Sequence, residues 1–153
     1  FWFESNEGKW KRGGRVNPNK TDIDLEYWWQ NLEEGNVHDD PGFTLNLENT
    51  EFEDPDNERT YILTQSAWNK VNNGTIKSSD SFAIAVKAKS GNSIICLAWN
   101  NASGTFKKGQ QIGVSLKSIE VPLHKRYHVR GKIYLFEGTM EVLKDRIRKE
   151  MSI

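Results

Sequence analysis

The segment from Ile76 to Trp99 constrains the fold more than any other, because it contains two strand patterns separated by one tight turn. Residues 81–89 alternate, with apolar side chains at every even position from Phe82 to Ala88, as in a strand with one larger apolar face. Residues 90–92 are Ser-Gly-Asn, a turn sequence. The next run is nearly continuous in apolar residues, which predicts a strand buried on both faces. The segment therefore predicts a β-hairpin that forms the buried frame of a sheet.

Similar patterns on both sides of this hairpin predict further strands. Gly131 lies between the last two and predicts a bulge or bend, and Pro122 favours an edge position because it lacks an amide donor. Loops are expected at 13–20, 36–42 and 48–59, and a turn at 100–104. The expected strands are an N-terminal aromatic hairpin, 1–4 with 9–12, and residues 43–47, 60–63, 111–116, 118–123, 126–130 and 132–136.

Two helices are expected, and residues 66–71 favour a single helical turn. The first runs from Thr21 or Asp22 to about Glu34, with Gly35 as a C-terminal stop. It is supported by an apolar stripe made of Leu25, Trp28, Trp29 and Leu32.

The second helix, 140–151, begins after Thr139 as a capping residue and carries one narrow apolar stripe. The expected fold class is therefore α+β: a mainly antiparallel curved sheet or a small β-barrel, with one N-terminal-half helix and one C-terminal helix. At 153 residues we expect a single domain, 1–153. Because the chain starts without Met or a signal-peptide pattern, we expect it to be excised from a longer protein.

The net charge is zero, but the charges are unevenly distributed along the chain. Residues 21–58 carry thirteen acidic and no basic side chains, whereas residues 105–153 carry eleven basic and five acidic ones. The two halves either attract each other within the fold or leave a basic surface for an anionic partner. An acidic loop lies at 48–59; its spacing matches no calcium-binding loop, so we expect a solvated loop rather than a cation site.

The sequence carries no recognisable catalytic signature. It contains no zinc-binding spacing, no phosphate loop with Lys and Ser or Thr, and no nucleophile elbow. Cys96 is the only cysteine and lies in the most apolar strand, where a cysteine is usually a small hydrophobic residue. We therefore expect no enzyme, no metal site and no cofactor. The absence of disulfides mildly favours a cytoplasmic location, and no run is long enough for a membrane span.

The candidate ligand-binding residues are tryptophans and nearby basic side chains. Tryptophan rings provide stacking surfaces, and Lys, Arg and His provide contacts to anions. For Trp28 and Trp29 the helical spacing favours a core role, with one ring at a cleft edge as the alternative. The candidates are Trp10, Trp28, Trp29, Trp68, Lys107, Lys108, Arg126, His128 and Arg130.

The central hairpin and its flanks resemble the barrel core of PUA-like domains, in particular EVE and YTH-type readers and the specificity domains of modification-dependent restriction systems. The residues are Ile76, Lys77 and Asp80, the strands Phe82 to Val86 and Ile94 to Ala98, and Lys108-Gly109. Ser79 stands where that family usually has glycine. The resemblance implies a reader of nucleic acid that holds a flipped or modified base in an aromatic cage.

A second part of the chain resembles the WWE domain, a reader of ADP-ribose polymers. The residues are Trp2 to Trp10, Leu25-Glu26 and Thr44 to Glu48, and this resemblance ends near Leu63. Three functions therefore stay open: a nucleic-acid reader with an aromatic, basic cleft, a carbohydrate-binding module with Trp platforms, and a protein-interaction or ADP-ribose-reading domain. The expected partners are nucleic acid or glycan, with no membrane and a neighbouring domain after Ile153.

Overall fold

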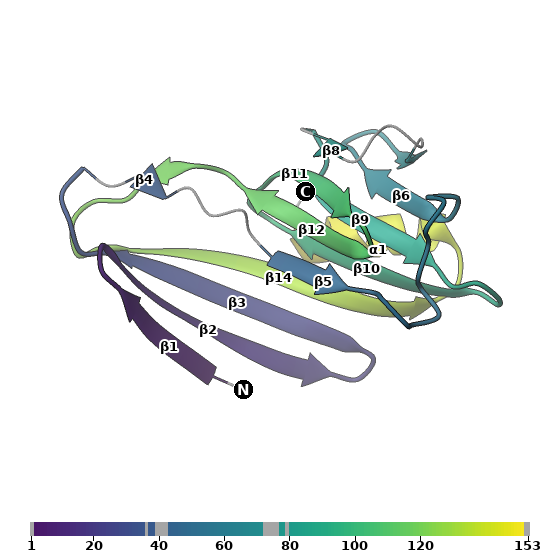
Figure 1. Cartoon of the computed structure of the whole chain (residues 1–153), viewed down its shortest axis with the longest axis horizontal. Coiled ribbons are helices and arrows are strands. Elements are labelled where there is room, and N and C mark those ends of the chain that lie inside the picture. The colour runs from purple at the N-terminus through teal and green to yellow at the C-terminus, as the bar shows by residue number, and fades with distance from the viewer. Residues whose placement is uncertain (1, 36, 39–42, 72–76, 79, 152–153) are drawn as a thin grey trace.

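The computed structural model describes residues 2–35, 37–38, 43–71, 77–78 and 80–151. The chain forms three layers (Figure 1): an eight-stranded sheet, a four-stranded sheet on one of its faces, and helix α1 (Met140–Met151) on the other. The mainly antiparallel sheet and the C-terminal helix expected from the sequence are confirmed.

All strand pairs of the eight-stranded sheet are antiparallel. Its order is β1 (Trp2–Glu7), β2 (Trp10–Asn19), β3 (Asp22–Asn31), β14 (Arg126–Glu137), β10 (Ser93–Trp99), β9 (Ala83–Lys87), β6 (Thr60–Leu63) and β7 (Trp68–Lys70).

The four-stranded sheet has the order β5 (Phe43–Asn46), β12 (Gln111–Leu116), β11 (Ala102–Lys108) and β8 (Lys77–Ser78). A small third sheet pairs β13 (Ile119–Glu120) with β4 (Val37–His38). In Figure 1, β1, β2, β3 and the first half of β14 extend as a wing beyond the region where the layers overlap.

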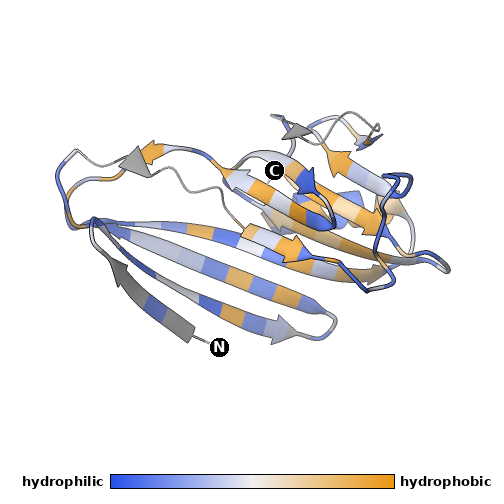
Figure 2. Ribbon diagram, in the orientation of Figure 1, coloured by the Kyte–Doolittle hydropathy of each residue, from blue (hydrophilic) through white to orange (hydrophobic). Residues whose placement is uncertain are grey.

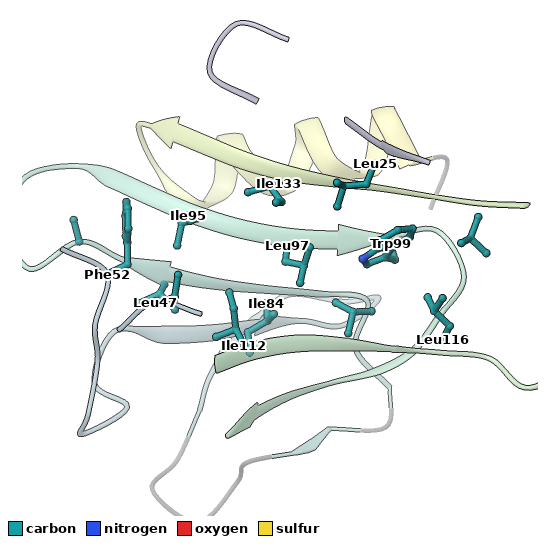
Figure 3. Packing of buried hydrophobic residues seen from close by; sticks show 14 of the residues in the cluster. Leu25, Leu47, Phe52, Ile84, Ile95, Leu97, Trp99, Ile112, Leu116 and Ile133 are labelled. Carbon is teal, nitrogen blue, oxygen red and sulfur yellow. The ribbon is translucent and has the colours of Figure 1, made fainter. Parts of the chain in front are cut away.

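Two apolar cores lie on opposite faces of the large sheet. The first fills the space between the two sheets, where Leu97, Trp99 and Ile112 are fully buried (Figure 3). The second lies under α1, whose Leu143 and Ile147 pack in one cluster with Cys96 and Tyr134. Figure 2 shows the resulting pattern: the central strands are largely apolar, whereas apolar and polar residues alternate along β3.

The central hairpin has the structure that its sequence predicts. Strands β9 and β10 pair in register from Ala98↔Ala83 to Ile94↔Lys87. Every residue from Ile94 to Trp99 is buried, since β10 faces the second sheet on one side and α1 on the other. Cys96 is a buried free thiol, and burial raises its pKa. Ile76 and Ser79 lie outside the described residues.

The expected helix from Thr21 or Asp22 to Glu34 is wrong, because residues 22–31 form strand β3. The odd residues from Ile23 to Trp29 belong to the core between the sheets, and Trp28 faces the opposite side. The apolar spacing fitted a helix, but pairing with β2 and β14 makes these residues a strand, with Leu25 and Trp29 on the face towards the second sheet. Tertiary pairing thus overrides a local helical pattern.

The barrel alternative is also wrong, since the sheets do not close. Strands β1 and β7 are the two edges of the large sheet and are not paired with each other in the part of the chain that the structure describes.

Four local expectations need correction as well. Residues 13–19 belong to β2, 68–70 form β7 in place of a helical turn, and 102–104 begin β11. Strand β14 is continuous through Gly131 rather than bulged there. The glycine makes room for Trp99, because a Cβ at this position would lie 2.4 Å from the indole ring.

Candidate functional site

Arg126, His128 and Arg130 form a row of exposed side chains, which we call the basic row, on the first half of β14. Alternate residues of a strand point to the same face and are separated by roughly 6.6 Å. This is the face on which α1 packs, but α1 covers only the second half of β14, where Glu150 contacts Lys132 and Tyr134. The basic row therefore lies on an open part of the large sheet.

The neighbouring strands add charges that are already paired. Lys11 lies 2.7 Å from Glu4, and Arg15 lies 3.5 Å from Glu26. Within the described residues, neither the Arg126 nor the Arg130 guanidinium forms an ion pair. The free positive charge of this face consequently comes from β14.

Trp28 lies beneath Arg126 of the basic row and is only 2% exposed. Its ring lies against Gly13, where a Cβ would come within 2.3 Å of the indole. The Arg126 guanidinium lies over the other face of the ring, 4.0 Å from its centroid, in a cation–π contact. The ring therefore positions Arg126 and is not itself open to a ligand.

The remaining candidate tryptophans are not brought together. Trp29 is 3% exposed in the core between the sheets, where it stacks on Tyr127 at 6.1 Å, and Trp10 packs half-buried against the same core. Trp68 lies on β7, at the opposite edge of the large sheet from β1, and donates a hydrogen bond from Nε1 to the Met140 carbonyl at 2.8 Å. The expected aromatic cleft is thus not formed by these rings.

Lys107 and Lys108 lie on β11 and differ sharply. Lys108 is exposed, whereas Lys107 is 5% exposed and donates hydrogen bonds to the Asp54 carbonyl and, at 2.5 Å, to Asn57 Oδ1. The expectation that Lys107 contacts a ligand is corrected by this burial. Its ammonium group holds the acidic loop 48–59 against the small sheet.

Asp54 is the centre of this buried cluster, which we call the Asp54 cluster (Asp54, Asn57, Arg59, Thr60, Lys107). Its carboxylate accepts hydrogen bonds from Thr60 Oγ1 at 2.7 Å and from the Arg59 amide at 2.8 Å. Burial alone raises the pKa of this carboxyl, but the bonds from Thr60 and Arg59 and the charges of Lys107 and Arg59 hold it below its ordinary value. The acidic loop is therefore anchored through Asp54, whereas its Glu48, Glu51, Asp56 and Glu58 side chains are exposed, as expected for a solvated loop.

A polar cleft of about 680 Å³ opens where four loop segments meet, and the sequence did not single it out. Asn100 lies in this cleft and joins it to the basic row, because its amide donates to the Arg130 carbonyl at 3.1 Å and its Oδ1 accepts from the Arg130 amide at 3.2 Å. The lining residues are Thr64, Gln65, Ser66, Asp80, Ser81, Phe82, Asn100, Ala102, Ser103 and Lys117.

The lining of the polar cleft suits a ligand with both donors and acceptors. Asp80 and Lys117 are exposed, and neither takes part in an ion pair among the described residues. Ser81 and Thr105 share a hydrogen bond of 2.5 Å in the buried wall. On the rim, Arg148 of α1 donates to the Gln65 carbonyl. Such groups bind a polar ring by hydrogen bonds, and carboxylate, amide and ammonium side chains supply both donors and acceptors.

The cleft was missed because its residues come from segments far apart in the sequence, each with an ordinary loop composition. Of its lining residues, only Asp80 and Phe82 were named from the sequence, through the PUA-like resemblance. By contrast, the alternation of Arg126, His128 and Arg130 with Tyr127 and Val129 was readable within one strand.

No protein-family model matches the chain, and neither does any curated protein. Within the described residues, no group of three or more His, Cys, Asp or Glu side chains is placed to hold a metal ion. Over the same part of the chain, no helix has both the length and the apolar character to cross a membrane.

Proposed function

We propose that this protein is a non-catalytic recognition module for a nucleic-acid strand. The basic row contacts successive phosphates, and the polar cleft receives one unstacked base. The observation that carries the proposal is the pair of hydrogen bonds between Asn100, which lines the cleft, and the Arg130 backbone, which places the cleft next to the end of the basic row.

The electrostatic arrangement supports this surface for a polyanion. Phosphate contacts from Arg supply most of the affinity for nucleic acid, and a base in a cleft adds selectivity. The acidic loop 48–59 lies at the other end of β14, where Glu51 and Leu135 line the same groove. At about 3.3 Å per residue, Leu135 lies roughly 17 Å beyond Arg130 along the strand. The loop is therefore kept away from the proposed phosphate path.

Acidic residues on the same face as the basic row are neutralised by partners. Lys132 lies 3.5 Å from Asp24 and 3.7 Å from Asp22, and Arg146 also pairs with Asp22. The carbohydrate alternative lacks comparable support, because no tryptophan is fully exposed among those whose side chains the structure describes. A nucleic-acid strand is therefore the better match.

The test is fluorescence anisotropy with a labelled single-stranded oligonucleotide of twelve nucleotides over a series of salt concentrations. For the double variant R126A/R130A we expect weaker binding and a shallower salt dependence. The slope of the logarithm of the binding constant against the logarithm of the salt concentration should fall in magnitude by about 0.7 for each phosphate contact that is lost. The matched control is K70A/K89A, which removes two exposed lysines outside the site.

D80A tests the polar cleft separately. Because Asp80 makes no phosphate contact in this proposal, the variant should change the preference among the four bases and leave the salt slope unchanged. No binding at low salt, or equal slopes for R126A/R130A and the control, would contradict the proposal.

A further inference from the structure

The second half of β14 has an open edge. The pairing of β14 with β3 ends at Ile133↔Ile23, whereas its pairing with β10 continues to Glu137↔Ser93. Beyond the β2–β3 turn, Leu135 to Glu137 therefore have a strand neighbour on one side only, in the part of the chain that the structure describes. An edge with unpaired amide and carbonyl groups is a template for another strand.

A groove of about 430 Å³ lies beside this edge, and we call it the acidic groove. Its apolar side chains include Leu135, which is 42% exposed although it is a large hydrophobic residue on a strand. Exposed apolar area next to a free edge is typical of a peptide-binding surface. The lining residues are Thr21, Glu51, Phe52, Ser93, Ile94, Leu135, Phe136 and Glu137.

The acidic side chains around the groove favour a ligand with basic side chains. Glu51 and Glu137 line the groove and are exposed, and neither has a cationic partner among the described residues. Glu51 also belongs to the acidic loop, in which Glu48, Asp56 and Glu58 are exposed. An extended segment with basic side chains next to apolar ones complements both the charge and the apolar lining.

We propose that the open edge of β14 and the acidic groove bind an extended, basic and apolar segment of a partner protein, which adds a strand beside Leu135 to Glu137. Because Leu135 and Glu137 share one face of β14, the side chains of the added strand on that face enter the groove beside Glu51 and Glu137, and the alternate ones lie on the face of α1. This surface lies at the opposite end of β14 from the basic row and does not depend on nucleic-acid binding.

The probe is a fluorescein-labelled octapeptide, Lys-Thr-Val-Thr-Lys-Thr-Val-Thr, which places lysine and valine on one face of an extended strand, and it is titrated with the full chain at low salt. We expect binding, at least tenfold weaker binding to the double variant E51K/E137K, and affinity within twofold of the original for E120K, which reverses an exposed charge on β13. The same peptide with every amide N-methylated should bind at least tenfold more weakly, because neither of its edges can then donate hydrogen bonds to a strand.

Hydrogen exchange provides the second readout, since strand addition should slow exchange at the amides of residues 135–137. The proposal is overturned if the octapeptide does not bind, if E51K/E137K binds as the original chain does, or if N-methylation has no effect. Concentration-dependent self-association of the protein without peptide, lost in E51K/E137K, would assign the edge to a second copy of the chain and would likewise overturn it.

Discussion

The Asp54 cluster and the basic row are both built from charged side chains, but they differ in what surrounds them. Lys107 is enclosed with Asp54 and Asn57 and has satisfied hydrogen bonds. Arg126 and Arg130 stand on an open sheet face without an acidic partner among the described residues. The same residue types therefore stabilise the fold when they are buried and paired, and are available for a ligand only when they are exposed and unpaired.

The largest effect is expected at the Asp54 cluster. D54A removes the acceptor for Thr60 Oγ1 and the Arg59 amide, and the carboxylate that lies 3.6 Å from the Arg59 guanidinium. Removing the buried partner of such an ion pair costs about 3–5 kcal/mol, which should appear in the free energy of unfolding measured with urea. D56A, which changes an exposed carboxylate in the same loop, should cost less than about 0.5 kcal/mol. Equal losses for the two variants would show that the cluster is not structural.

Acid should reproduce part of this loss. The lowered pKa of Asp54 means that its contribution to stability is complete above its ordinary pKa of about 3.9 and is lost as the pH falls through the folded-state value. Glu150 acts in the same direction. Burial raises its pKa, but hydrogen bonds from Tyr134, Lys132 and Arg146 lower it by more, so that the net pKa is below the ordinary value. Urea unfolding between pH 7 and pH 3 should therefore show a steeper acid loss for the original chain than for D54N. A parallel pH dependence would contradict this role.

A smaller effect is expected beneath the basic row. In G13A the added Cβ overlaps the Trp28 ring, so the indole must shift and its contact with Arg126 is disturbed. Overpacking of this kind costs about 1–3 kcal/mol. In the background of W28L the same G13A change should cost clearly less, which a double-mutant cycle measures. Additive costs would mean that Gly13 is not required by the Trp28 ring.

The smallest effect on stability is expected for the basic row itself. R130A should change the free energy of unfolding by less than about 0.5 kcal/mol, and R126A by about 0.5–1 kcal/mol because it also loses the cation–π contact. Thermal unfolding of R126A and R130A measures these losses of stability, and K107M provides the comparison with a buried residue of the Asp54 cluster. A loss at Arg130 as large as that of K107M would place the row among the structural residues.

Local patterns predicted several elements well. The hairpin of β9 and β10, the strands β6 and β12 and helix α1 were predicted at or near their observed bounds, because each has a clear period and nearby turn residues. Residues 22–31 were misassigned because Leu25, Trp28, Trp29 and Leu32 suit a helical stripe, whereas the strand pattern depends on partners from β2 and β14. The polar cleft was missed for a related reason, since its lining comes from separate loops.

The antiparallel core, the terminal helix and the buried state of Cys96 could be predicted from the chain, because they follow from alternation and apolar content within short segments. Which charges are free could not. Lys107 and Arg126 are both basic residues in or beside a strand pattern, and the chain alone does not show that one meets Asp54 and the other lies over Trp28. Burial and pairing depend on contacts between segments far apart in sequence, and local periodicity does not encode these contacts.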